Sequence, residues 1–230
     1  MTDSGSSSRP KQLRLKLKRP ASFARADFVR SPVNAQAIAA LDTWPDWPGG
    51  CLVLVGPEGG GKSHLATEWA ARAKALRLDP AQTDLSAANG RAILLEDADR
   101  GPNDETLFHL LNIAGASGGV LLTARTLPGQ WPTALPDLRS RLNALFVAEI
   151  GPPDDVVLEG VLRKFFRERN IRPADDVYPY LLRRIERSVP AALDIVTRLD
   201  EIADAEQRDI TRALARQILE NEGETLNLFD

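Results

Sequence analysis

The stretch Gly56-Pro-Glu-Gly-Gly-Gly-Lys-Ser63 follows the pattern G-x-x-x-x-G-K-[ST] and decides the fold. Before it, Cys51-Leu-Val-Leu-Val55 is an unbroken apolar run, typical of a buried parallel strand. After it, residues 64–74 carry apolar side chains at helical spacing. Strand, glycine-rich loop and helix together surround a phosphate with backbone N–H groups and the positive end of a helix. The stretch therefore predicts a nucleoside phosphate site rather than a plain glycine-rich turn.

Each position of this loop has an expected role. The glycines permit the tight path of the chain and let the backbone approach the nucleotide closely. We expect Lys62 to reach the β- and γ-phosphates and the Ser63 hydroxyl to bind Mg²⁺. The predicted cofactors are ADP or ATP with Mg²⁺. The predicted contact residues are Gly56, Pro57, Glu58, Gly59, Gly60, Gly61, Lys62, Ser63 and His64.

A second apolar run, residues 92–95, is followed by the two acids Glu96 and Asp97. This is the Walker B layout, in which Glu96 holds Mg²⁺ directly or through water and Asp97 orients the attacking water. The usual order for hydrolysis is Asp then Glu, and here it is reversed. Because phosphoryl transfer depends on positioning, the reversal favours slow or absent turnover by this chain. The alternative interpretation of the pair is an exposed strand end.

Composition and charge exclude several classes of protein. Hydrophobic residues make up 43% and charged residues 27% of the 230 residues, as in ordinary soluble proteins. The net charge of −3 does not provide a basic field for nucleic acid over the whole chain. Neither a signal-peptide core nor a run of eighteen apolar residues is found, so we expect a cytoplasmic protein without a membrane partner. Cys51 lies in the predicted core strand and is expected to be a small buried apolar residue.

Periodicity divides the chain into an α/β part with a parallel sheet and flanking helices, and a smaller all-α part. Further helices are predicted over residues 31–44 and 104–116, and further strands over residues 75–78, 119–124 and 146–150. Four amphipathic helical segments follow, at residues 154–170, 173–186, 190–205 and 209–221. The predicted domains are an N-terminal arm (1–19), a nucleotide-binding domain (20–152), a helical domain (153–221) and a C-terminal tail (222–230).

Both ends of the chain carry a short peptide with alternating apolar residues. In the basic segment 11–19, three leucines alternate with polar or basic residues, which is strand periodicity. An extended peptide of this kind is suited to docking into a groove of another protein. Two other interpretations stay open, an edge strand of this domain and a basic arm that contacts phosphates.

The order of the parts resembles that of AAA+ ATPases, in which an α/β P-loop NTPase domain is followed by a small all-α lid domain. Leu135-Pro-Asp-Leu-Arg-Ser-Arg-Leu142 is similar to the arginine-finger segment of the bacterial replication initiator DnaA and its relatives. From Gln12 to about Asn221 the chain resembles the Hda family of DnaA-related regulators. The resemblance implies that Arg141 is an arginine finger, directed in trans at ATP held by DnaA. It also implies that the nucleotide in the chain's own pocket is mainly a structural ligand.

The resemblance also implies a second partner. Gln12-Leu-Arg-Leu-Lys-Leu17 is similar to the peptide by which Hda proteins bind the DNA polymerase III sliding clamp (beta subunit). The C-terminal segment Thr225-Leu-Asn-Leu-Phe229 resembles a clamp-binding pentapeptide that lacks the leading Gln, so the N-terminal peptide is the preferred site. The predicted partner-binding residues are Gln12, Leu13, Leu15 and Leu17, with Leu226, Leu228 and Phe229 as the second candidate.

The implied function is negative regulation of replication initiation, by clamp-dependent stimulation of the ATPase of DnaA. No helix-turn-helix pattern follows the lid, so sequence-specific DNA binding is not expected; homodimer formation is left open. Two positions depart from the family: Val189-Pro190 stands where a nucleotide-sensing lid arginine is usual, and Arg125 where a shorter polar residue is usual. The first alternative is an autonomous AAA+ ATPase that depends on Glu96 and Asp97. The second is a DnaA-like factor that binds nucleic acid through residues 11–19, and the third is a P-loop domain with neither a clamp nor an initiator partner.

Overall fold

The computed structural model describes residues 28–79, 85–100, 102–116 and 118–226. The predicted clamp peptide at residues 12–17 lies outside these ranges, as do Leu228 and Phe229. Leu226 is the last residue of the C-terminal helix.

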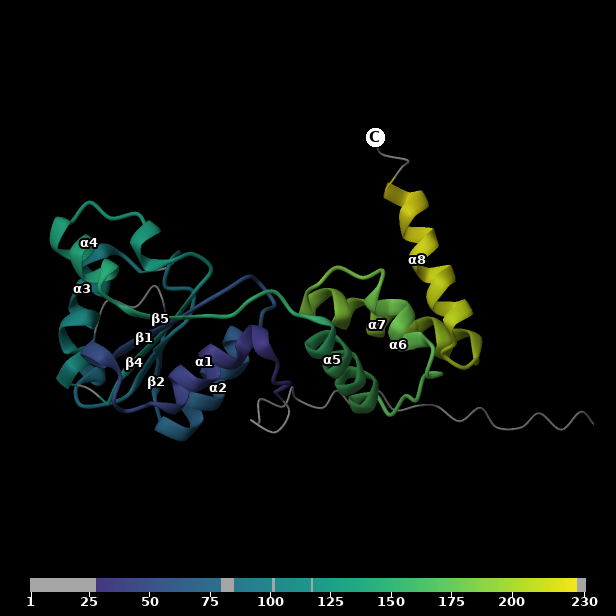
Figure 1. Ribbon diagram of the computed structural model, residues 1–230, viewed down its shortest axis with the longest axis horizontal. Coiled ribbons are helices and arrows are strands. Elements are labelled where there is room, and N and C mark those ends of the chain that lie inside the picture. The colour runs from purple at the N-terminus through teal and green to yellow at the C-terminus, as the bar shows by residue number, and fades with distance from the viewer. Residues whose placement is uncertain (1–27, 80–84, 101, 117, 227–230) are drawn as a thin grey trace, which may run out of the picture.

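Five short strands form a single parallel sheet in the order β2-β3-β4-β1-β5 (Figure 1). The strands are β1 (Cys51–Val55), β2 (Leu76–Leu78), β3 (Ile93–Leu95), β4 (Val120–Ala124) and β5 (Phe146–Glu149). Every residue of β1, β3 and β4 is buried, because helices cover both faces of the sheet. This two-sided burial explains why β1 and β3 are continuous apolar runs, and why β4 is apolar apart from Thr123.

Helices pack on both faces of this sheet. They are α1 (Pro32–Asp42), α2 (Lys62–Ala73), α3 (Asp104–Ile113) and α4 (Pro136–Asn143). Successive side chains of a strand point to opposite faces. In β1, Val53 and Val55 pack with α3 and α4, whereas Leu52 and Leu54 pack with α1 and α2. Cys51 is buried in the first of these two clusters, and burial raises the pKa of its thiol to about 12. Its predicted role as a buried apolar residue is confirmed.

The strand order brings three connections to one edge of the sheet. Because β4 lies between β1 and β3, the chain leaves all three strands side by side at their carboxyl ends. The glycine-rich loop follows β1, Arg125 follows β4, and Glu96 follows β3. Ligands of open parallel sheets bind beyond the carboxyl ends of the strands. The topology therefore places these groups around one candidate site.

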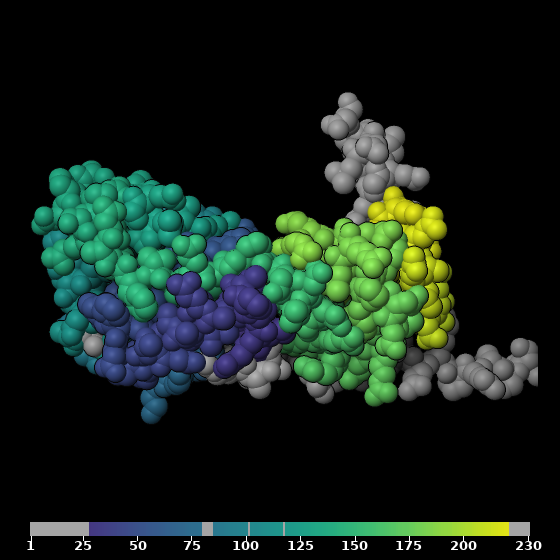
Figure 2. All heavy atoms as spheres, in the orientation of Figure 1, coloured from purple at the N-terminus to yellow at the C-terminus, as the bar shows by residue number. Residues whose placement is uncertain are grey.

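The remaining helices form a separate bundle beside the α/β part (Figures 1 and 2). They are α5 (Asp155–Glu168), α6 (Val177–Leu182), α7 (Val189–Glu206) and α8 (Arg212–Leu226). Side chains such as Leu162, Phe166, Leu181, Leu199 and Leu214 form a core of their own. The predicted fold class, an α/β domain with a parallel sheet followed by a small helical lid, is confirmed.

Two helices of the lid differ from their predicted extents. The segment 173–186 was predicted to be helical throughout, whereas α6 covers only Val177–Leu182. Pro179 explains the late start, since proline lacks an N–H group and fits a helix only in its first turn. At the other end, α8 continues to Leu226, beyond the predicted end at residue 221. Gly223 costs only about 1 kcal/mol inside a helix and does not end it.

Within the described ranges, no helix combines the length and the apolar character that a membrane span requires.

Candidate functional site

The loop between β1 and α2 has a conformation that only glycine adopts readily. Gly59 and Gly61 have φ angles of +68° and +96°, in the left-handed region that side chains disfavour. The N–H of Gly56 donates to the carbonyl of Ala124 at the end of β4, at 3.2 Å. A Cβ atom on Gly56 would lie 2.5 Å from the carbonyl oxygen of Ile150. The loop is therefore a close-fitting backbone cradle at the start of α2, as phosphate binding requires.

Lys62 lies inside this cradle. Its Nζ donates to the carbonyl oxygens of Gly56 at 2.7 Å and Pro57 at 2.8 Å. Only 8% of the residue is exposed. Its ammonium group is thus held at the centre of the loop, where an incoming phosphate would compete with the two carbonyls for its protons. Ser63, the predicted Mg²⁺ ligand, is exposed in the first turn of α2.

The charges around Lys62 show which side chains surround the cradle. Its pKa is lowered, first by burial and then by the positive charge of Arg125. The carboxylates of Asp97, Asp99 and Glu58 act in the opposite direction and raise it. A guanidinium, an ammonium and three carboxylates therefore lie close enough to influence one another at the mouth of the loop.

Asp99 organises the turn after β4. Its Oδ2 accepts the N–H of Arg125 at 2.9 Å, and the N–H and hydroxyl of Thr126 at 3.3 Å each. Its Oδ1 is buried and accepts no hydrogen bond from the described residues. A buried acceptor of this kind is suited to a bound water or to the hydration shell of a cation. The cradle and this oxygen fit a phosphate with its metal ion.

The two predicted Walker B acids point toward arginines. Glu96 Oε1 is 3.3 Å from Nη1 of Arg77 on β2. Asp97 has a φ angle of +52°, and its N–H donates to Thr123 Oγ1 at 3.1 Å. Its carboxylate, 60% exposed, is 3.9 Å from Nη2 of Arg100. The metal role of Glu96 and the water-orienting role of Asp97 stay predictions.

An aromatic pair lies beside the first turn of α2. The rings of Phe28 and His64 have centroids 5.1 Å apart, at an interplanar angle of 60°. A Cβ on Gly61 would lie 3.1 Å from Phe28 Cε2, so the ring also covers the loop. These rings provide an apolar surface next to the predicted phosphate site.

The lid contacts the loop directly. A Cβ atom on Gly59 would overlap Cδ of Pro190 and lie 3.2 Å from the backbone nitrogen of Val189. The Ser188 side chain accepts the N–H of Ala191 at 3.2 Å and begins α7 at this contact. The start of α7 therefore lies against the phosphate loop, and its first two side chains there are uncharged.

The finger segment places two arginines differently. Arg139 donates to the carbonyls of Gly129 and Trp131, at 2.6 Å each, and so supports the preceding loop. Arg141 is exposed, with its guanidinium carbon 4.9 Å from the ring centroid of Phe108 on α3. Helices α3 and α4 lie at the end of the α/β domain that faces away from the lid (Figure 1).

Comparisons with known proteins agree with this arrangement. A family model described as "Hda, lid domain" matches residues 159–219. The chromosomal replication initiator protein DnaA of Thermomicrobium roseum is 28% identical over 226 aligned residues, covering 84% of this chain and 48% of the relative. Domain III of the Thermotoga maritima initiator DnaA superposes with a TM-score of 0.72 at 16% identity, over 86% of this chain and 96% of that one. The chain is related to the Hda and DnaA proteins.

This DnaA-related protein spans about half the length of the Thermomicrobium relative. A DnaA from Aquifex aeolicus, solved with AMPPCP bound, has a TM-score of 0.62 at 18% identity, over 75% of this chain and 63% of that one. At this identity the likeness concerns the fold, and the fold is one that holds a nucleotide in that relative.

The lid contact gives a testable consequence. We expect Gly59→Ala to weaken nucleotide binding about tenfold, or about 1.4 kcal/mol, because alanine is strained at a positive φ and its methyl group displaces Pro190. The measurement is titration with a fluorescent ADP analogue. Gly90→Ala is the matched control, since Gly90 has a φ of +70° and nothing within 4 Å of its Cβ position. Equal losses in both variants would rule out a role for the Pro190 contact.

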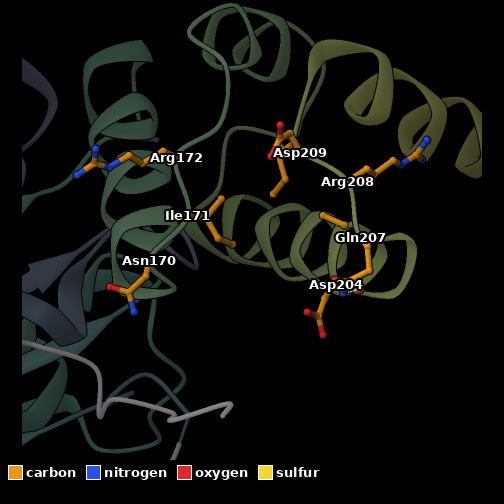
Figure 3. Close-up of a pocket in the computed structure, with 9 residues that line it drawn as sticks. Asn170, Ile171, Arg172, Asp204, Gln207, Arg208 and Asp209 are labelled. Atoms are coloured by element: carbon orange, nitrogen blue, oxygen red, sulfur yellow. Dashed lines mark hydrogen bonds between the residues drawn. The ribbon is translucent and has the colours of Figure 1, made fainter. Parts of the chain in front are cut away.

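The lid of this DnaA-related protein contains a pocket that the sequence did not predict (Figure 3). It has a volume of about 470 Å³ and lies between the end of α5 and the turn from α7 to α8. Arg208 at its rim pairs with Glu206 at 2.7 Å and donates to Gln217 at 2.9 Å. The polar side chains that line it include Asn170, Arg172, Asp204, Gln207, Arg208 and Asp209.

Proposed function

We propose that this protein binds ADP or ATP in its own phosphate loop and activates ATP hydrolysis by DnaA. In this proposal Arg141 is donated across a subunit boundary to the γ-phosphate of ATP held by the initiator. An arginine supplied in trans neutralises charge that develops on the transferred phosphoryl group, which raises the rate by on the order of 10³–10⁵. DnaA converted to its ADP form would then no longer initiate replication.

The observation that carries the proposal is the position of Arg141. Its side chain is exposed on α4, at the end of the α/β domain away from the lid, whereas the lid contacts the chain's own loop at Gly59. A guanidinium in that place is suited to a neighbouring molecule rather than to the chain's own nucleotide. The neighbouring Arg139 is used internally, by two carbonyl groups.

Weak hydrolysis by the chain itself is consistent with the acids of its own site. Glu96 faces Arg77 and Asp97 faces Arg100, and the order of the two acids is the reverse of the usual one. If Mg²⁺ is bound, Ser63 and Glu96 would hold it, and the metal would supply charge neutralisation to the phosphates. The chain's own nucleotide then serves chiefly to hold the loop and the lid together.

The sliding clamp is the proposed platform for this reaction. Gln12-Leu-Arg-Leu-Lys-Leu17 would dock in a clamp pocket, with Gln12 as a hydrogen-bonding residue and Leu15 and Leu17 as apolar anchors. A clamp present on DNA only after initiation would restrict the reaction to that stage. One chain would thus carry a docking peptide, a nucleotide-binding domain and an arginine finger.

The experiment measures ATP hydrolysis by DnaA with this protein, in the presence and absence of DNA-loaded clamp. We expect stimulation that requires the clamp and falls at least tenfold with the double variant Gln12→Ala/Leu13→Ala, because the docking peptide is lost. A chain truncated before Thr225 is the control and is expected to keep stimulation. Loss only on truncation would move the docking site to the C-terminal peptide. Hydrolysis by this protein alone, lost with Asp97→Ala, would favour an autonomous ATPase.

A further inference from the structure

Two arginines from different parts of the lid lie over the ring of Tyr180. The guanidinium carbon of Arg184 is 4.1 Å from the ring centroid, and that of Arg212 is 5.3 Å from it. Tyr180 belongs to α6 and is buried in the core of the lid, so its ring is a fixed support for both side chains. Contact with an aromatic face stabilises each cation. It also holds two like charges close together.

No carboxylate neutralises these two arginines within the part of the chain that the structure describes. Both are exposed, and neither Arg184 nor Arg212 forms an ion pair there. A third arginine of the lid shows the contrast. Arg163 lies 4.1 Å from the ring centroid of Tyr178 and pairs with Glu159 at 2.7 Å. The charges over Tyr180 are therefore free to bind an anion from solution.

The start of α8 increases the positive potential at this place. Arg212 is the first residue of α8, and the first turn of this helix contains no acidic residue. A helix N-terminus carries a partial positive charge and unpaired N–H groups, so a cation there is unfavourable and an anion is favourable. An anion bound at Arg184 and Arg212 would thus relieve two repulsions, one between the guanidinium groups and one between Arg212 and its own helix.

The surface formed by Arg184, Arg212 and the ring of Tyr180 is called the Tyr180 patch below. It is built on α6 and α8, which lie on the side of the lid away from the α/β domain (Figure 1). The phosphate loop contacts the lid elsewhere, at the start of α7. The backbone beside the patch is fixed, since the N–H of Arg184 donates to the carbonyl of Leu181 at 2.9 Å. The patch is therefore separate from the nucleotide site and open to a partner.

We propose that the Tyr180 patch binds backbone phosphates of duplex DNA. This inference rests on the clamp-docking part of the proposed function, because a protein held on a DNA-loaded clamp has a duplex beside it. Arginine suits a phosphate, since its planar fork donates two parallel hydrogen bonds. Phosphate contacts hold a protein in position on DNA without reading its sequence. The net charge of −3 is consistent with a local contact of this kind, which would add to the affinity for the clamp.

The measurement is the affinity of the full-length chain for a short, fluorescently labelled DNA duplex over a series of salt concentrations, without clamp or DnaA. The double variant Arg184→Ala/Arg212→Ala, the patch variant, should weaken binding at low salt at least about tenfold. It should also reduce the slope of log K against log salt by about 2, because two phosphate contacts are lost. Arg184→Lys/Arg212→Lys should keep most of this slope, since both charges remain.

Two controls separate the patch from other cations of the chain. Arg163→Ala removes an arginine that also lies over a tyrosine but is neutralised by Glu159, so the salt slope should change little. Lys18→Ala/Arg19→Ala removes two charges from the basic segment 11–19. In that background the patch variant should still weaken DNA binding by the same factor.

Failure of this inference is distinct from failure of the proposed function. No binding of the duplex by the wild type at low salt, or equal binding by the wild type and the patch variant, would overturn the DNA contact. A patch variant that keeps its affinity for DNA but no longer stimulates DnaA would instead assign the patch to an acidic protein surface. Because Gln12 and Arg141 are unchanged in these variants, none of these results tests clamp docking or the finger. A chain that binds the duplex through the patch but does not bind the clamp would support the DNA contact and contradict the proposed platform.

Discussion

Replacement of Arg141 with alanine is expected to lower clamp-dependent hydrolysis of DnaA-bound ATP by about a thousandfold, or to the unstimulated rate where that is higher. The expected loss is large because the finger acts on charge that develops only in the transition state. Arg141 is exposed, and its contact within the chain is a cation–π arrangement with Phe108 at 4.9 Å. Such an exposed contact is worth roughly 0.5–1 kcal/mol, so the variant should stay folded.

Two variants of the same segment separate chemistry from structure. Arg141→Lys keeps the charge but loses the planar fork, and we expect it to recover only a small part of the stimulation. Arg139→Ala removes two hydrogen bonds to carbonyl groups of the loop before α4, so it should lower the thermal stability of the protein. It should reduce stimulation of DnaA only as far as this loop loses its structure. Clamp binding should be unchanged in every case. Full stimulation of DnaA by Arg141→Ala would contradict the assignment of Arg141 as the arginine finger.

The strands and the main helices could be predicted because their signals are local. The run at residues 51–55 is apolar throughout, and the run at residues 119–124 is apolar apart from Thr123, since both faces of the sheet are covered. The glycine-rich loop fixes where α2 begins. The predicted helix over residues 31–44 likewise agrees with the start of α1 at Pro32. The late start of α6 is also a local effect, because Pro179 fits a helix only in its first turn, whereas the helical pattern was extended over residues 173–186.

The contacts that define the site could not be predicted in the same way. Glu58 meets Arg125 across 67 positions of sequence, and Pro190 meets Gly59 from a different domain. Periodicity carries no information about such partners, because they depend on strand order and on the docking of the lid. Asp99 was missed for the same reason, although a third acid shortly after the Walker B pair was a usable signal. The sequence indicated which residues form the phosphate site, whereas the strand order determines which charged side chains face each other.

Loss of Lys62 is the second change with a large expected effect. Lys62→Ala should weaken binding of both ADP and ATP by at least about a hundredfold, because it removes a buried ammonium from the centre of the loop. It also leaves the carbonyls of Gly56 and Pro57 without their donor. The loss should be similar for the two nucleotides, since the cradle itself is damaged.

The thermal stability of the chain with ADP measures this effect directly. Ligand at 100 times its Kd stabilises a protein by about 2.7 kcal/mol, whereas a hundredfold weaker Kd leaves only about 0.4 kcal/mol at the same concentration. We therefore expect ADP to raise the melting temperature of the wild type clearly and that of Lys62→Ala hardly at all. Arg72→Ala is the control on the same helix: it loses contacts to Leu41 and Asp42, so its melting temperature falls while its gain with ADP is kept. If ADP raised the melting temperature of Lys62→Ala as much as that of the wild type, ADP would bind elsewhere. A nucleotide bound in this loop must lose affinity when the positive charge at the centre of the loop is removed.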